Sequence, residues 1–88
     1  MTSKSKVVRL TAKINRYNRL EVFFDGQSAL KFHSSTVKGM NSFDAATQLG
    51  LVVLEKLNKI GEVLVLPEDV GAFHNLVFWW TDQINSYL

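Results

Sequence analysis

The sequence contains no cysteine, one proline and two histidines. The absence of cysteine excludes disulfide bonds, thiolate zinc sites and cysteine nucleophiles. His33 and His74 fall in different predicted elements, and no acidic cluster accompanies them at ligand spacing. Because most metal sites need three or four ligands, we expect neither a metal nor another cofactor.

Long apolar runs are also missing. The longest are Leu51–Leu54 and Leu76–Trp80, whereas a membrane span needs roughly 18–20 apolar residues. No basic segment leads into an apolar stretch and a cleavage site, as a secretion signal would. We therefore expect a cytoplasmic protein that does not contact membranes. Its composition predicts a disordered polar tail over residues 1–5 and a single α+β domain over residues 6–88.

No group of residues specifies a reaction. The hydroxyl groups of Ser34, Ser35 and Thr36 lie in a polar connector without a base to activate them. Glu68 and Asp69 are consecutive, and consecutive helical side chains point about 100° apart, so they cannot act as a facing carboxylate pair. Their expected role is favourable charge at a helix start. The sequence therefore predicts a protein that is not an enzyme and has no small-molecule substrate.

Charge is distributed unevenly along the chain. Residues 1–38 hold eight of the ten Lys and Arg residues and carry a net charge of +6, whereas residues 39–88 hold six of the eight Asp and Glu residues and carry −4. Such asymmetry is typical of a protein with a strongly charged partner, of which nucleic acid is the commonest.

The first part of the chain has the two-residue period of β-strands. Apolar and polar side chains alternate over Lys6–Ile14, Arg19–Phe24 and Ala29–His33. Asn, Asp and Gly residues separate these segments and provide turn chemistry. The pattern predicts an antiparallel three-stranded meander.

Strand register follows from a parity rule, because opposed residues must share a face of the sheet. The rule predicts a three-residue loop, Asp25–Gln27, although Asp25-Gly26 alone favours a two-residue turn. The first hairpin has two solutions. A three-residue loop, Asn15–Tyr17, places Lys13 opposite Arg19, and a five-residue loop, Asn15–Arg19, places Lys13 opposite Glu21 and Arg9 opposite Asp25. Like-charge repulsion favours the second solution.

After Gly39 the apolar period changes to that of a helix. A first helix is predicted to begin at a cap formed by Asn41 or Ser42 and to end at Gly61. Its predicted inner stripe is Phe43, Ala46, Gly50, Val53, Leu57 and Ile60. On that stripe, the missing side chain of Gly50 allows another backbone to approach.

The pattern of residues 62–88 predicts one strand and one helix. Glu62–Leu66 reads as a short strand buried on both sides, and Pro67 suits the first position of a second helix. That helix has the predicted inner stripe Val70, Phe73, Val77, Trp80, Ile84 and Tyr87. The expected fold is α+β, an antiparallel three- to four-stranded sheet with two helices on one face, in the order β-β-β-α-β-α.

Two surfaces are candidates for binding. The outer sheet face and its first turn present basic and aromatic residues suited to single-stranded nucleic acid, since cations meet phosphates and rings stack on bases. These residues are Arg9, Lys13, Arg16, Tyr17, Arg19, Phe23, Lys31 and His33. The five-residue loop would instead cancel part of this charge in cross-strand pairs.

The second surface is the surplus of apolar residues on the helices, which exceeds what one small sheet can cover. Its candidate interface residues are Leu51, Leu54, Leu76, Phe78 and Trp79, beside Leu49 and Val52, with Trp80 assigned to the core. Burial of these residues between the helices and under residues 34–40 is the alternative.

The resulting hypothesis is a small non-enzymatic binding protein that forms a homodimer through its helices and binds nucleic acid through its basic sheet face. The alternative is a regulatory interaction module or inhibitor that docks on a larger protein.

Overall fold

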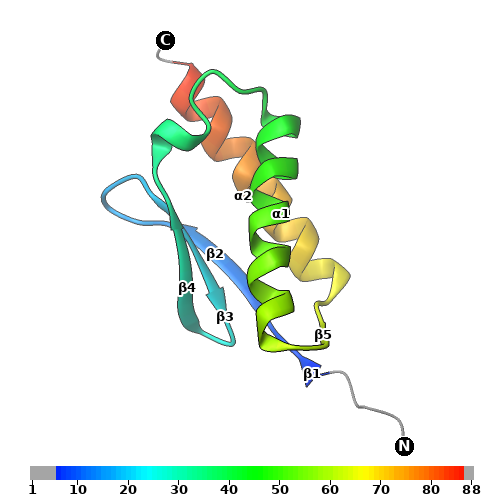
Figure 1. Ribbon diagram of the computed structural model, residues 1–88. Helices are drawn as coiled ribbons and strands as arrows, with labels where there is room; N and C mark the ends of the chain where they lie inside the picture. The colour runs from blue at the N-terminus through cyan, green and yellow to red at the C-terminus, as the bar shows by residue number, and fades with distance from the viewer. Residues whose placement is uncertain (1–5, 87–88) are drawn as a thin grey trace, which may run out of the picture.

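The computed structural model describes residues 6–86, so the tail predicted at residues 1–5, as well as Tyr87 and Leu88, lies outside the described residues. The elements in chain order are β1 (Lys6–Val7), β2 (Leu10–Ile14), β3 (Leu20–Phe24), β4 (Gln27–Phe32), the 3-10 turn η1 (Ser34–Thr36), α1 (Ser42–Ile60), β5 (Val63–Leu64) and α2 (Pro67–Asn85). Strands β2, β3 and β4 form the antiparallel meander, and both helices lie on one side of it (Figure 1). The α+β class is confirmed, with one strand more than expected.

The extra strand arises because the segment predicted as one strand, residues 6–14, pairs along both of its edges. The amides of Lys6 and Val8 donate to the carbonyls of Glu62 and Leu64 around β5, whereas the amide of Asp25 donates to the carbonyl of Arg9 on the β3 side. Alternate backbone groups of an extended chain point to opposite edges. Strand β5 is therefore parallel to β1 and does not extend the meander. Leu64 is 53% exposed, so the expectation that β5 is buried on both sides was wrong.

The first hairpin has the five-residue loop. Lys13 lies opposite Glu21 and Ile14 opposite Leu20, as the charge-paired solution requires. The side-chain oxygen of Asn15 accepts hydrogen bonds from the amides of Tyr17 and Arg19, and this local bonding stabilises the turn.

The second hairpin has a two-residue loop, so the predicted three-residue loop was wrong. Asp25 and Gly26 both have positive φ, 52° and 81°, which is typical of a two-residue type I′ turn. Phe23 then pairs with Ser28, but Val22 pairs with Leu30, so Ala29 is the extra residue of a β-bulge. The bulge restores the parity that keeps Leu20, Val22 and Phe32 in the core. The local turn signal and the global parity rule are thus both satisfied.

Helix α1 begins as predicted, because the side chain of Asn41 accepts a hydrogen bond from the amide of Asp44 at 2.8 Å. Its buried residues are Ala45, Ala46, Leu49, Val53 and Leu57. Phe43 and Ile60, predicted on the inner stripe, are exposed, and Leu49, predicted outside it, is buried. The predicted and observed stripes share Ala46, Val53 and Leu57. Burial of Leu49 in the core that also contains Leu20 and Val22 of β3 selects the observed stripe.

Helix α2 has Pro67 in its first turn and buries Phe73, Val77 and Trp80, as predicted. The indole nitrogen of Trp80 donates to the side-chain oxygen of Asn18 in the first hairpin at 3.1 Å. At the C-terminal end of α2, the side chain of Asn85 donates to the carbonyls of Val37 and Met40. These bonds hold α2 against the first hairpin and against the connection between β4 and α1. Within residues 6–86, no helix combines the length and apolar character needed to cross a bilayer.

Candidate functional site

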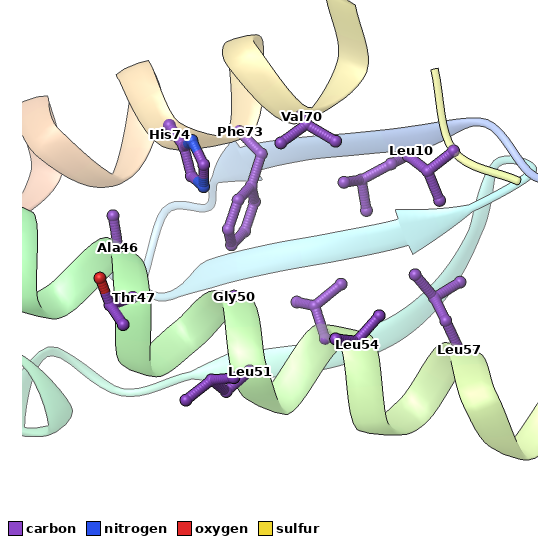
Figure 2. A pocket seen from close by; sticks show the side chains of 12 residues that line it. Leu10, Ala46, Thr47, Gly50, Leu51, Leu54, Leu57, Val70, Phe73 and His74 are labelled. Carbon is purple, nitrogen blue, oxygen red and sulfur yellow. The ribbon is translucent and has the colours of Figure 1, made fainter. Parts of the chain in front are cut away.

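An apolar groove separates α1 from α2 (Figure 2). It has a volume of about 310 Å³, and its floor includes Leu10 of β2 and Val53 of α1. Helix α1 contributes Ala46, Thr47, Gly50, Leu51, Leu54 and Leu57, and helix α2 contributes Val70, Phe73 and His74, with Val65 before the start of α2. The ring of Phe73 points between the two helices. Apart from Thr47 and His74, every side chain that lines the groove is apolar.

Gly50 leaves part of the groove unfilled. A β-carbon built at this position would have no side chain or distant backbone atom within 4 Å, and its φ is not positive. A glycine inside a helix destabilises it by about 1 kcal/mol relative to alanine. Nothing in residues 6–86 therefore explains Gly50, and the backbone predicted to approach it does not come from this part of the chain. Gly71 in α2 is equally open but does not line the groove.

Apart from Thr47, the rim of the groove is apolar on its α1 side. Leu51 and Leu54 are 57% and 53% exposed, so both side chains stand beside the hollow at Gly50. On the α2 side, His74 stacks on Phe78 with ring centroids 6.3 Å apart. Exposed apolar surface that continues into a groove is typical of a contact between proteins.

The predicted interface residues thus divide into three groups. Leu51 and Leu54 line the groove, whereas Leu76 and Phe78 are half-buried against the core. Trp79 is exposed but does not line the groove. The structure therefore brings two of the five residues together at the groove.

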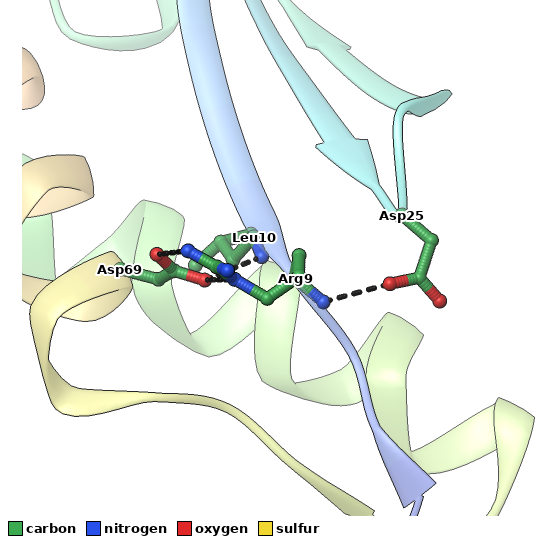
Figure 3. Close-up of polar contacts among 4 residues, drawn as sticks. All are labelled: Arg9, Leu10, Asp25 and Asp69. Carbon is green, nitrogen blue, oxygen red and sulfur yellow. Dashed lines mark hydrogen bonds and ion pairs between the residues drawn. The ribbon is translucent and has the colours of Figure 1, made fainter.

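Asp69 connects α2 to the edge of β2 (Figure 3). Its carboxylate accepts hydrogen bonds from Nε and Nη2 of Arg9, at 2.9 and 3.1 Å, and from the amide of Leu10 at 3.0 Å. The hydrogen bond from the Arg9 side chain holds the pKa of Asp69 below its ordinary value, burial opposes this effect, and the Leu10 amide adds to it. The pKa of Arg9 is raised by the same hydrogen bond.

Arg9 is therefore part of the structural framework and is not a free cation of the sheet face. Its amide also donates to the side chain of Asp25 at 2.9 Å. An arginine bound by two hydrogen bonds to a carboxylate is already charge-paired. This geometry removes Arg9 from the predicted nucleic-acid surface.

The rest of the basic sheet face is partly neutralised. Glu21 lies between Lys13 and Lys31 in one cross-strand row. The ammonium of Lys13 lies 5.4 Å from the centre of the Phe23 ring, within the range of a cation–π contact. His33 accepts a hydrogen bond from the amide of Ser35 and caps η1.

The tip of the first hairpin keeps its positive charge. The guanidinium of Arg16 lies 5.0 Å from the centre of the Tyr17 ring, and its Nη2 donates to the Tyr17 hydroxyl at 2.9 Å. Arg19 is exposed at the same tip. Within residues 6–86, no acidic side chain forms an ion pair with Arg16 or Arg19.

Sequence reasoning missed the roles of Asp69 and His74. The spacing of Asp69 from Phe73 and Val77 placed it on the buried stripe of α2, and that phase was an available signal of a buried carboxylate. The contribution of His74 to the groove depends on the angle between the helices, which no local pattern encodes.

The described part of the chain contains no group of three or more His, Asp or Glu side chains that could hold a metal ion. No protein-family model matches the sequence, and no curated protein or solved structure is significantly similar to it. The fold and the groove define a small α+β protein with an open apolar cleft between two helices and a basic hairpin tip.

Proposed function

We propose that this protein is a non-enzymatic protein–protein interaction module whose docking site is the groove between α1 and α2. Apolar side chains of another protein chain enter the groove beside Gly50. One observation carries this proposal, namely that the apolar hollow at Gly50 has no occupant within the described chain. Burial of apolar surface, about 25 cal/mol per Å², supplies the driving force.

A side chain from another protein fits the groove better than a polar small molecule. A dry cavity of about 150 Å³ can hold benzene, so the volume of about 310 Å³ suffices for two apolar groups of that size. Small-molecule sites normally add several convergent polar groups that fix the ligand. Here Thr47 and His74 are the polar side chains on the lining, while exposed Leu51 and Leu54 widen the apolar surface.

The second candidate function is binding of single-stranded nucleic acid by the sheet face and hairpin tip. The observation that favours it is the cluster of Arg16, Tyr17 and Arg19, in which neither arginine forms an ion pair within residues 6–86. Lys13 and Lys31 continue this cluster on the sheet. Cations with neighbouring aromatic rings suit phosphates and unstacked bases. The cross-strand pairing with Glu21 weakens this potential, so the groove remains the first candidate.

Photo-crosslinking from two positions distinguishes these functions. A benzophenone side chain at Thr47, on the groove, is expected to form an adduct with a protein in native lysate, and Leu54→Glu is expected to abolish it. The same group at Thr11, on the outer sheet face, serves as the matched control. Nuclease-sensitive adducts from Thr11 alone would favour nucleic acid and contradict the proposed docking site. Equal protein adducts from both positions would also contradict it.

A further inference from the structure

We propose that the occupant of the groove is a second copy of this chain, with the two α1 helices antiparallel about a two-fold axis. Leu54 of each copy enters the groove over Gly50 of the other. This inference rests on the proposed function and names the partner for the same site.

The first support is that one helix carries both the projection and the hollow. A two-fold interface uses the same patch on both subunits, so that patch must be complementary to itself. Leu54 is one helical turn from Gly50 and is 53% exposed. When two antiparallel α1 helices are centred on residue 52, Leu54 of one copy lies opposite Gly50 of the partner subunit, and the reverse contact forms by symmetry.

The same register is favourable for the charges along α1. Asp44 lies in its first turn and Lys59 in its last turn. The antiparallel arrangement places the end of α1 that carries Asp44 in one copy alongside the end that carries Lys59 in the partner subunit. It also makes the two helix dipoles antiparallel, so that the positive N-terminal end of each α1 lies beside the negative C-terminal end of the other. Glu55 then faces the region of Gln48 in the other copy, so the register juxtaposes no like charges.

The third support is Gly50 itself, whose open surroundings have no explanation within residues 6–86 of one copy. Small residues allow two helix backbones to approach closely, and a β-carbon at the crossing would keep them apart. Gly71, which is also helical and open, provides a matched control because it does not line the groove.

Sedimentation equilibrium of the purified chain tests the oligomeric state. The wild type is expected to be a dimer in reversible equilibrium with monomer. Gly50→Ala is expected to weaken the dimer about tenfold or more, since overpacking in a well-fitted contact costs roughly this much. Gly71→Ala is expected to leave the dimer unchanged, and both alanines are expected to raise the melting temperature of the monomer. Leu54→Glu is expected to be a folded monomer by circular dichroism.

Disulfide trapping tests the register and benefits from the absence of native cysteine. An equimolar mixture of Gly50→Cys and Leu54→Cys chains is expected to form a disulfide-linked heterodimer under mild oxidation. Each variant alone, and a mixture of Gly50→Cys with Thr11→Cys, is expected to give much less.

Two outcomes would overturn the inference. A wild type that stays monomeric up to about 1 mM, the weak end of specific binding, removes the second copy as partner. A dimer that persists in Leu54→Glu and gives no Gly50–Leu54 crosslink uses another surface. Neither result would decide whether the groove is a docking site. The crosslink from Thr47 tests that proposal separately, because it detects any protein partner.

Discussion

Replacing Trp80 by alanine is expected to lower the free energy of unfolding by about 3–5 kcal/mol, the usual cost of removing a large buried aromatic side chain. Trp80 is 0% exposed, and its indole nitrogen donates to Asn18 in the first hairpin. The substitution leaves a cavity and an unpaired Asn18 oxygen. A chain of this size has a total stability of roughly 5–13 kcal/mol, so the variant is expected to be marginally folded. Urea denaturation followed by far-ultraviolet circular dichroism measures the change.

The neighbouring tryptophan provides a matched control. Trp79 is 55% exposed on the same helix, and surface substitutions usually change stability by no more than about 0.5 kcal/mol. Trp79→Ala is therefore expected to keep nearly the wild-type denaturation midpoint. Similar losses in the two alanine variants would contradict the assignment of Trp80 to the core and Trp79 to the surface.

Replacing Asp69 by asparagine is expected to destabilise the protein at neutral pH and to flatten its loss of stability in acid. The folded state holds the pKa of Asp69 below its unfolded value, chiefly through the hydrogen bond from the Arg9 side chain. The stabilisation is therefore fully present above the unfolded value, about 4, and is lost as the pH falls through the lowered folded pKa. Below that pH, wild type and variant both present a neutral group to Arg9, so their stabilities are expected to converge.

Melting temperatures recorded from pH 7 to pH 2 measure this effect. Glu68→Gln is the matched control, because Glu68 is an exposed carboxylate in the same helical turn and affects Arg9 only through charge. Its curve is expected to follow the wild type closely. A constant offset between the Asp69→Asn and wild-type curves down to pH 2 would show that Asp69 stabilises the fold without its charge.

The sequence was sufficient for the elements whose signals are local. Alternation over Leu20–Phe24 and capping by Asn41 and Gly61 predicted strand β3 and helix α1, and charge repulsion correctly favoured pairing of Lys13 with Glu21. The second hairpin shows the limit of such reasoning. Parity excluded a two-residue turn, but a bulge at Ala29 allowed both the turn and the register. A bulge of one residue shifts the strand register but leaves almost no mark on the amino-acid composition of the strand. The alternation of apolar and polar residues therefore did not reveal it.

The candidate site was predictable in part. The surplus of apolar residues indicated exposed Leu51 and Leu54. The predicted stripe of α1 included Gly50, which lines the groove, but no backbone within residues 6–86 approaches it as expected. The sequence did not show that Phe73 and His74 would face these residues, because the crossing of two helices depends on the whole core. Likewise, the bond between Arg9 and Asp69 joins residues 60 positions apart, and strand alternation alone assigned Arg9 to the outer face.

The most direct test of the groove as a contact surface between chains is methyl NMR of the leucine and valine side chains over a dilution series. The methyl signals of Leu54, Leu57 and Val70, which line the groove, are expected to shift with concentration. Those of Leu64, which is exposed but lies outside the groove, are expected to stay constant. Groove methyl signals that stay fixed while Leu64 shifts would show that the chains meet elsewhere.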